Sequence, residues 1–123
     1  MYDGTADHLS VAFPATEQFL RLGRVTVSGL ALRLGVELAI VENLRAAIDL
    51  ALSHLAGVGT INLQASWEPG HLAIDLENTE QTIDEPTAAR LQDELRVLVV
   101  DAQVNTSHIV IAIEDEVEAT PRS

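Results

Sequence analysis

Few side chains in this sequence could do chemistry, and their types limit what that chemistry could be. The absence of cysteine excludes thiolate nucleophiles, disulfides and thiolate metal sites. No metal site is expected from the four scattered histidines, His8, His54, His71 and His108. Asp49 and Ser53 carry oxygen groups four positions apart, a spacing that places both on one face of a helix. No glycine-rich phosphate loop accompanies them.

The segment 36–55, VELAIVENLRAAIDLALSHL, is predicted to form the helix that carries this pair. Its apolar stripe recurs at steps of three or four residues: Leu38, Val41, Leu44, Ile48, Leu52 and Leu55. A second, polar stripe includes Asp49, whose simplest role is a surface ion pair with Arg45. Gly57 and Gly59 mark the end of the helix.

The elements around this helix predict an α+β fold. Strands are expected at 9–13, 60–67, 71–76 and 107–113, with further helices at 16–35 and from Pro86 through Ala102. This order predicts a two-layer sandwich, with helices on one face of a mixed, mostly antiparallel sheet. Trp67 is interpreted as hairpin packing against a helix rather than as a stacking platform.

Composition excludes several classes of partner. The 123 residues fit one domain, and a formal charge of -12 repels nucleic acid and anionic membrane surfaces. The sequence shows no membrane-spanning run and no signal peptide, so the expected location is the cytoplasm. Residues 1–114 are expected to form the domain, and residues 115–123 an acidic, mobile tail.

Three short matches carry a family resemblance over the first half of the chain. They are Phe-Pro-Ala at 13–15, Leu-Gly at 34–35, and the run Asn-Leu-Arg-x-Ala-hydrophobic-Asp at 43–49. With the order of elements, this text resembles the RsbW-like anti-sigma-factor serine kinases of the histidine-kinase-like (GHKL) ATPase fold. The resemblance implies one histidine-kinase-like ATPase domain, a homodimer, and a protein partner such as a sigma factor or an anti-sigma antagonist.

In that family the second helix carries a Glu and an Asn one turn apart, for general base catalysis and for Mg²⁺. The best register puts Leu50 and His54 at these positions. Leucine cannot accept a proton, and imidazole is a poor Mg²⁺ ligand beside oxygen. A register shifted by one residue uses Asp49 and Ser53, but it rotates the pair by about 100° around the helix.

The family's second motif, Asp-x-Gly-x-Gly, contacts adenine through its Asp. Here the corresponding stretch 77–81 reads Glu-Asn-Thr-Glu-Gln, so Glu77 is the adenine-contacting candidate and both glycines are absent. The family's long lid is reduced to the segment 77–85. Together with a cleft-facing row of Ala47, Leu50 and His54, these changes predict a former nucleotide pocket that is collapsed or filled by side chains.

The resemblance therefore implies a regulatory protein-binding module with a degenerate ATP site and no kinase activity, requiring no cofactor. The alternative is an active ATP-dependent serine kinase that binds ATP and Mg²⁺ in a rearranged site, with Asp49 as the base. A structural subunit that shares only the fold is a third possibility.

Overall fold

Five strands and three helices make up residues 7–115, the part of the chain that this computed structural model describes. The strands are β1 (His8–Pro14), β2 (Thr60–Glu68), β3 (His71–Glu77), β4 (Asp101–Val104) and β5 (His108–Glu114). The helices are α1 (Glu17–Arg33), α2 (Leu38–Leu55) and α3 (Glu85–Leu98).

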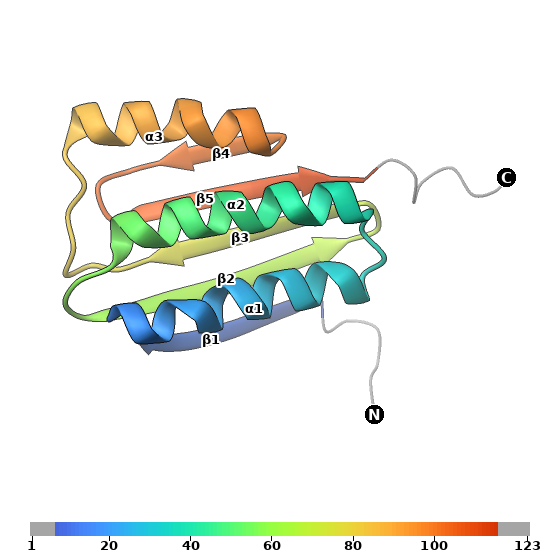
Figure 1. Ribbon diagram of the computed structural model, residues 1–123, viewed down its shortest axis with the longest axis horizontal. Helices are drawn as coiled ribbons and strands as arrows, with labels where there is room; N and C mark the ends of the chain where they lie inside the picture. Colours follow the sequence, from blue (N-terminus) through green and yellow to red (C-terminus); the bar gives the residue numbers. More distant parts are fainter. Residues whose placement is uncertain (1–6, 116–123) are drawn as a thin grey trace, which may run out of the picture.

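The strands form one sheet in the order β1-β2-β3-β5-β4, and each neighbouring pair is antiparallel. The predicted hairpin is present: Glu68 pairs with His71 across a turn at Pro69 and Gly70. All three helices lie on the same side of this sheet (Figure 1). The predicted α+β two-layer sandwich is thus confirmed, although the sheet is wholly antiparallel and not mixed.

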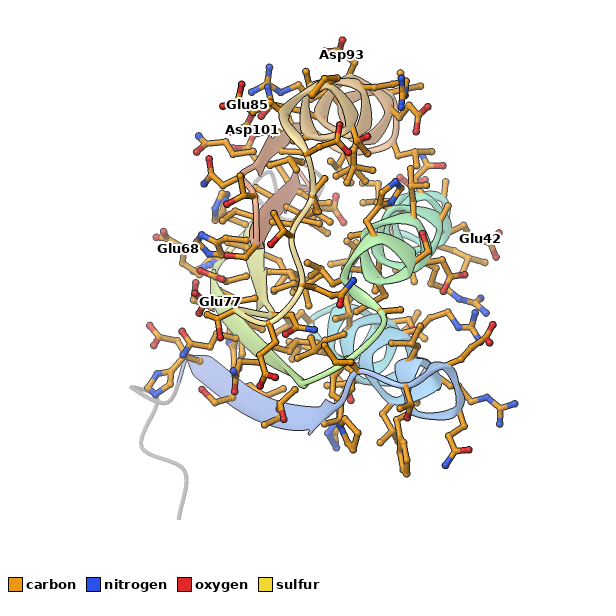
Figure 2. All side chains as sticks on the ribbon, turned by 90° about the vertical axis from the view of Figure 1, so that its left-hand side faces the viewer. Glu42, Glu68, Glu77, Glu85, Asp93 and Asp101 are labelled. Atoms are coloured by element: carbon orange, nitrogen blue, oxygen red, sulfur yellow. The ribbon has the colours of Figure 1, made fainter. Side chains whose placement is uncertain are left out.

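The core lies between the sheet and the helices, because the central strands alternate strictly. Their inward residues are almost completely buried: Ile61, Leu63 and Ala65 on β2, Leu72, Ile74 and Leu76 on β3, and Ile109, Ile111 and Ile113 on β5. Burying one such isoleucine or leucine contributes roughly 1.5–3 kcal/mol. The alternate residues, such as Gln64 and Asp75, face the open side of the sheet, as Figure 2 shows for Glu77 and Glu68.

Helix α2 is the central helix, and it packs against both α1 and α3. Five residues of its predicted apolar stripe are buried, among them Leu44, Ile48 and Leu52. The exception is Leu38, which remains 62% exposed because it stands at the first turn of the helix. The stripe therefore determines how α2 sits on the sheet, as the periodicity predicts.

The prediction of a helix reaching Ala102 was wrong. Helix α3 ends at Leu98, and Asp101–Val104 forms β4 beside β5. Val99 has an extended backbone, and Ala102 is buried as the strand partner of Ile111. Consecutive β-branched residues favour a strand, and pairing with β5 overrides the helical spacing of the apolar residues.

The C-terminal end of the described residues packs against the domain. Asp115, assigned to the tail from sequence, is buried, and its backbone N–H donates to the carbonyl of Gly70 at 3.0 Å. The remainder of the predicted tail, 116–123, lies outside the described residues. Within 7–115, none of the helices has the length and apolar character needed to cross a membrane.

Candidate functional site

The resemblance assigns the two catalytic positions to Leu50 and His54, which lie on the last turns of α2. Leu50 is half-buried against the core. The half-buried His54 has its Nδ1 3.0 Å from the Leu50 carbonyl oxygen. Ser53 also turns back onto its own helix, donating from Oγ to the same carbonyl at 2.7 Å. These polar groups are thus occupied within α2.

Asp49 points toward α1. Both of its carboxylate oxygens lie 3.0 Å from Nη1 of Arg24, and the pair is exposed. The ion pair predicted with Arg45 was wrong, because the neighbouring helix supplies the nearer guanidinium. Asp49 and Ser53 share a helix face as their spacing requires, but they engage different partners.

The connection between β3 and α3, residues 78–84, packs against the end of α2. Its anchor is Asn78, which is completely buried. The Asn78 amide donates from Nδ2 to the carbonyl oxygens of Leu55 and Val58, each at 2.9 Å. Its Oδ1 accepts the backbone N–H of Glu80 at 3.0 Å. The side chain therefore satisfies a carbonyl that the end of α2 leaves without a helical partner.

Further contacts hold the same connection in place. The Ile83 backbone N–H donates to the Thr106 carbonyl at 2.6 Å, and the Ile83 side chain is buried. On the other side, Gln81 accepts the Val58 N–H at 3.4 Å. Val58 lies in the loop after α2, so the connection joins that loop to the chain entering β5.

Two glycines allow this close packing. Gly59 has a φ of +87°, and a Cβ there would lie 2.9 Å from Oδ1 of Asn78. Gly57 has a φ of +142°, and its Cβ would lie 2.6 Å from Oε1 of Gln81. Glycine is favoured at both positions, because a larger residue would be strained and would collide with the connection. The sequence interpretation of these glycines as a helix stop missed this second role.

Glu77 and Asn78 point in opposite directions. Strand alternation places Glu77 on the open side of the sheet, half-buried, across from α2 (Figure 2). Asn78 turns to the helix side instead. The polar side chain that meets α2 at this position is therefore Asn78, which the sequence analysis passed over. The signal that could have found it is the alternation itself: Leu72, Ile74 and Leu76 put position 78 on the buried face.

The outer face of α1 is a second candidate site. Leu22, Val25 and Leu32 follow one another at helical spacing, and they are 48%, 58% and 54% exposed. Gly29 lies in the same row, and a Cβ there would meet no atom within 4 Å. Beside this row, a groove of about 690 Å³ lies between α1 and β1, with Leu30, Leu34 and Trp67 among its lining residues. An exposed apolar row beside a groove is typical of a protein-binding surface.

Asp84, at the end of the connection 78–84, has a lowered pKa. Hydrogen bonds from the side chain and then the backbone N–H of Thr87 hold the pKa of Asp84 below its ordinary value. Asp84 caps α3, so this shift belongs to a helix start. Among residues 7–115, no group of three or more histidines and carboxylates is placed to hold a metal ion.

Comparisons with known proteins give a match in structure only. No family model matches the chain, and no curated protein matches it in sequence. Twelve chains of solved structures match its fold. One is the crystal structure of the RsbU and RsbW domains of Rv1364c from Mycobacterium tuberculosis, with a TM-score of 0.70 and 14% identity. The match covers 88% of this chain and 32% of that one.

The likeness is one of fold. At 14% identity the match shows a shared α+β sandwich fold, and it carries no residue roles. The chain spans about a third of the length of its structural neighbour.

Proposed function

We propose that this protein is a regulatory binding module that resembles an anti-sigma factor, and that it binds its partner without phosphorylating it. The partner would be a sigma factor or an anti-sigma antagonist. The observation that carries the proposal is the apolar row on the outer face of α1. Leu22, Val25 and Leu32 are each about half exposed, although a leucine or valine gains about 1.5–3 kcal/mol when it is fully buried. A partner that covers this row would recover that energy.

The end of α2 supports the absence of catalysis. The family position for the general base is held by Leu50, which has no titratable group, and the position for the Mg²⁺ ligand by His54. The adjacent connection is packed onto α2 through Asn78. A nucleotide at this place would have to displace a buried side chain that makes three hydrogen bonds.

A charge placed in the apolar row tests the binding surface. Gly29→Glu adds a carboxylate in the middle of the row, where a Cβ has free space, and it improves helix propensity at an exposed position. We expect the affinity for the partner to fall by about tenfold or more, as is usual when the centre of an interface is disturbed. The measurement is calorimetric titration against a panel of purified sigma factors and anti-sigma antagonists from the same genome.

The matched control is Ala89→Glu, which adds the same side chain at an exposed position of α3. It should leave partner affinity within about twofold, since surface substitutions away from an interface are usually near neutral. If both variants weakened partner binding equally, the added net charge, and not its position on α1, would be the cause.

Nucleotide binding is tested by thermal unfolding with and without Mg-ATP. A ligand at one hundred times its dissociation constant stabilises the folded protein by about 2.7 kcal/mol, which would raise Tm by several degrees. We expect no shift at millimolar Mg-ATP and no transfer of radiolabelled phosphate to any partner that binds. A clear Tm shift with phosphate transfer would establish the kinase in place of the regulator.

We also propose a homodimer in the cytoplasm, following the resemblance. Strand β1 is an edge strand of the sheet, and edge strands carry backbone groups that a second copy can pair with. Light scattering should give twice the 13.2 kDa mass of the chain. A monomer at micromolar concentration would rule this assembly out.

A further inference from the structure

A cavity of about 310 Å³ opens at the end of the sandwich that holds the turn between β2 and β3. Its lining includes Leu34 and Val36 from the connection between α1 and α2, and Trp67, Leu72 and Ile113 from the sheet. In Figure 1 this is the right-hand end, away from the connection 78–84. The volume is at the small end of ligand pockets, roughly 300–1,000 Å³.

The polar part of the lining is acidic. Asp7, Glu68 and Asp115 line the cavity together with His71, and none of the lining residues within 7–115 is a lysine or arginine. Asp115 is only 5% exposed, and its Oδ2 accepts the backbone N–H of Glu37 at 2.8 Å, so the carboxylate is held in a fixed position. Asp7 and Asp115 stand beside the apolar floor, and Glu68 stands at the rim, where it faces the open side of the sheet. On a chain of formal charge -12, these carboxylates give the cavity a negative potential.

Trp67 supplies an aromatic wall to the same cavity. It is half-buried and packs against the core, as predicted for the hairpin. Tryptophan is the best aromatic partner for a cation within about 6 Å of its ring, and the attraction grows when the site is shielded from water. The apolar floor fits a hydrocarbon body, while the carboxylates and the indole together favour a positive charge.

We propose that this cavity binds a small organic cation, an ammonium group on an aromatic or alkyl body. The charge argues against acids and phosphates, which the carboxylates would repel, and the small volume limits the body to about one ring. This site shares Leu34 and Trp67 with the groove beside α1, but it lies away from the end of α2. The proposal adds to the proposed function and does not rest on it.

Titration with 2-phenylethylammonium tests the site. Trp67 is the only tryptophan, so its fluorescence, excited where the phenyl ring does not absorb, reports on the cavity directly. We expect a saturable change that weakens as salt is added. The neutral 2-phenylethanol and the anionic 3-phenylpropionate should bind about tenfold more weakly or not at all. Equal binding of the alcohol would overturn the proposal, as would no response to the amine.

The acidic rim is tested by Glu68→Gln. Glu68 is exposed, so the variant should fold normally. It should bind 2-phenylethylammonium about two- to fivefold more weakly, the loss expected for one exposed charge partner. Its matched control is Glu42→Gln, which removes the same charge from α2 on the opposite side of the molecule (Figure 2). Equal weakening by the control would show a general charge effect and would refute a local site.

Trp67 also lines the groove beside α1, so the two places have to be separated. Gly29→Glu adds a negative charge beside that groove, and it should leave the affinity for 2-phenylethylammonium unchanged. Tighter amine binding by this variant would indicate that the cation binds in the groove, and it would contradict the proposal for the cavity. Loss of partner binding by the same variant with unchanged amine binding would show that the two sites are separate.

Discussion

At one end of the sandwich the connection 78–84 packs onto the last turn of α2, whereas at the other end the turn between β2 and β3 stands beside a cavity of about 310 Å³. Both ends place a polar side chain at a terminus of α2. At the closed end the Asn78 amide donates to carbonyls at the C-terminus, and at the open end the Asp115 carboxylate accepts the Glu37 N–H at the N-terminus. The Asn78 donor meets the partly negative C-terminus of α2, and the Asp115 carboxylate meets its partly positive N-terminus, so both fit the helix dipole.

The difference lies in what surrounds these two side chains. Asn78 is completely buried, and its neighbours Ile83 and Gln81 complete the packing. Asp115 is also buried, but it shares a cavity wall with Glu68 and Asp7. The end to which the resemblance assigns nucleotide chemistry therefore has buried polar packing, and the cavity lies at the opposite end.

Asn78→Asp should have the largest effect on stability, because it changes the side chain that anchors the connection 78–84 to α2. The new carboxylate cannot donate to the carbonyls of Leu55 and Val58, and it places a charge in a fully buried position. We expect a loss of more than about 3 kcal/mol in the free energy of unfolding, since an unsatisfied buried group costs about 1–3 kcal/mol and a charged one more. Urea unfolding at neutral pH measures it.

Acid should partly rescue this variant. Burial would raise the pKa of the new carboxyl, and only the protonated form can donate to a carbonyl. The destabilisation should therefore be smallest at acid pH and grow as pH rises through the raised pKa. Asn43→Asp, at an exposed position of α2, is the matched control and should cost less than about 0.5 kcal/mol. If Asn78→Asp lost as little stability as the control, the Asn78 amide would not be what holds the connection 78–84 on α2.

Gly59→Ala should have the next largest effect at the same end. The φ of +87° is strained for alanine, and the new Cβ would lie 2.9 Å from Oδ1 of Asn78. We expect about 2 kcal/mol of destabilisation, the range found for a residue held in an unfavourable backbone region. Gly29→Ala is the control in open helical surroundings and should stabilise by up to about 1 kcal/mol. A loss of stability in Gly29→Ala with no loss in Gly59→Ala would contradict this account.

The sequence predicted most of the fold because its patterns are local. Alternation in β2, β3 and β5 and the apolar stripe of α2 each depend on residues a few positions apart, and both patterns were confirmed. The error at β4 has a non-local cause. Four residues, Asp101–Val104, become a strand only because β5 offers a partner. Periodicity along α3 could not reveal that partner.

The candidate sites were less predictable for the same reason. The spacing of Asp49 and Ser53 was informative about a helix face, but the partner of Asp49 is Arg24, 25 positions away in sequence. Asn78 is recognised only when the end of α2 is seen beside it. The cavity joins Asp7, the α1–α2 connection, the hairpin turn and Asp115, which are distant in the chain. Such sites follow from the tertiary arrangement.

The smallest effect on stability is expected at Asp84, where the connection 78–84 ends and α3 begins. Asp84 accepts the Thr87 hydroxyl at 2.8 Å and the Thr87 backbone N–H at 3.2 Å, the first of these being the main cause of its lowered pKa. A carboxyl whose pKa is lowered in the folded state contributes stability above its unfolded value of 3.8, and this contribution is lost as pH falls through the lowered folded pKa. Wild-type stability should therefore decline in that window.

Asp84→Asn keeps an acceptor oxygen but cannot ionise, so it should be slightly less stable at neutral pH and should lose less stability below pH 3.8. The measurement is the urea midpoint at a series of pH values on both sides of this pKa. Asp93→Asn, also on α3, removes the same charge without a capping contact and should keep the wild-type pH dependence. Parallel curves for wild type and Asp84→Asn would mean that this cap contributes nothing to the closed end, whose stability would then rest on Asn78 and the buried Ile83 alone.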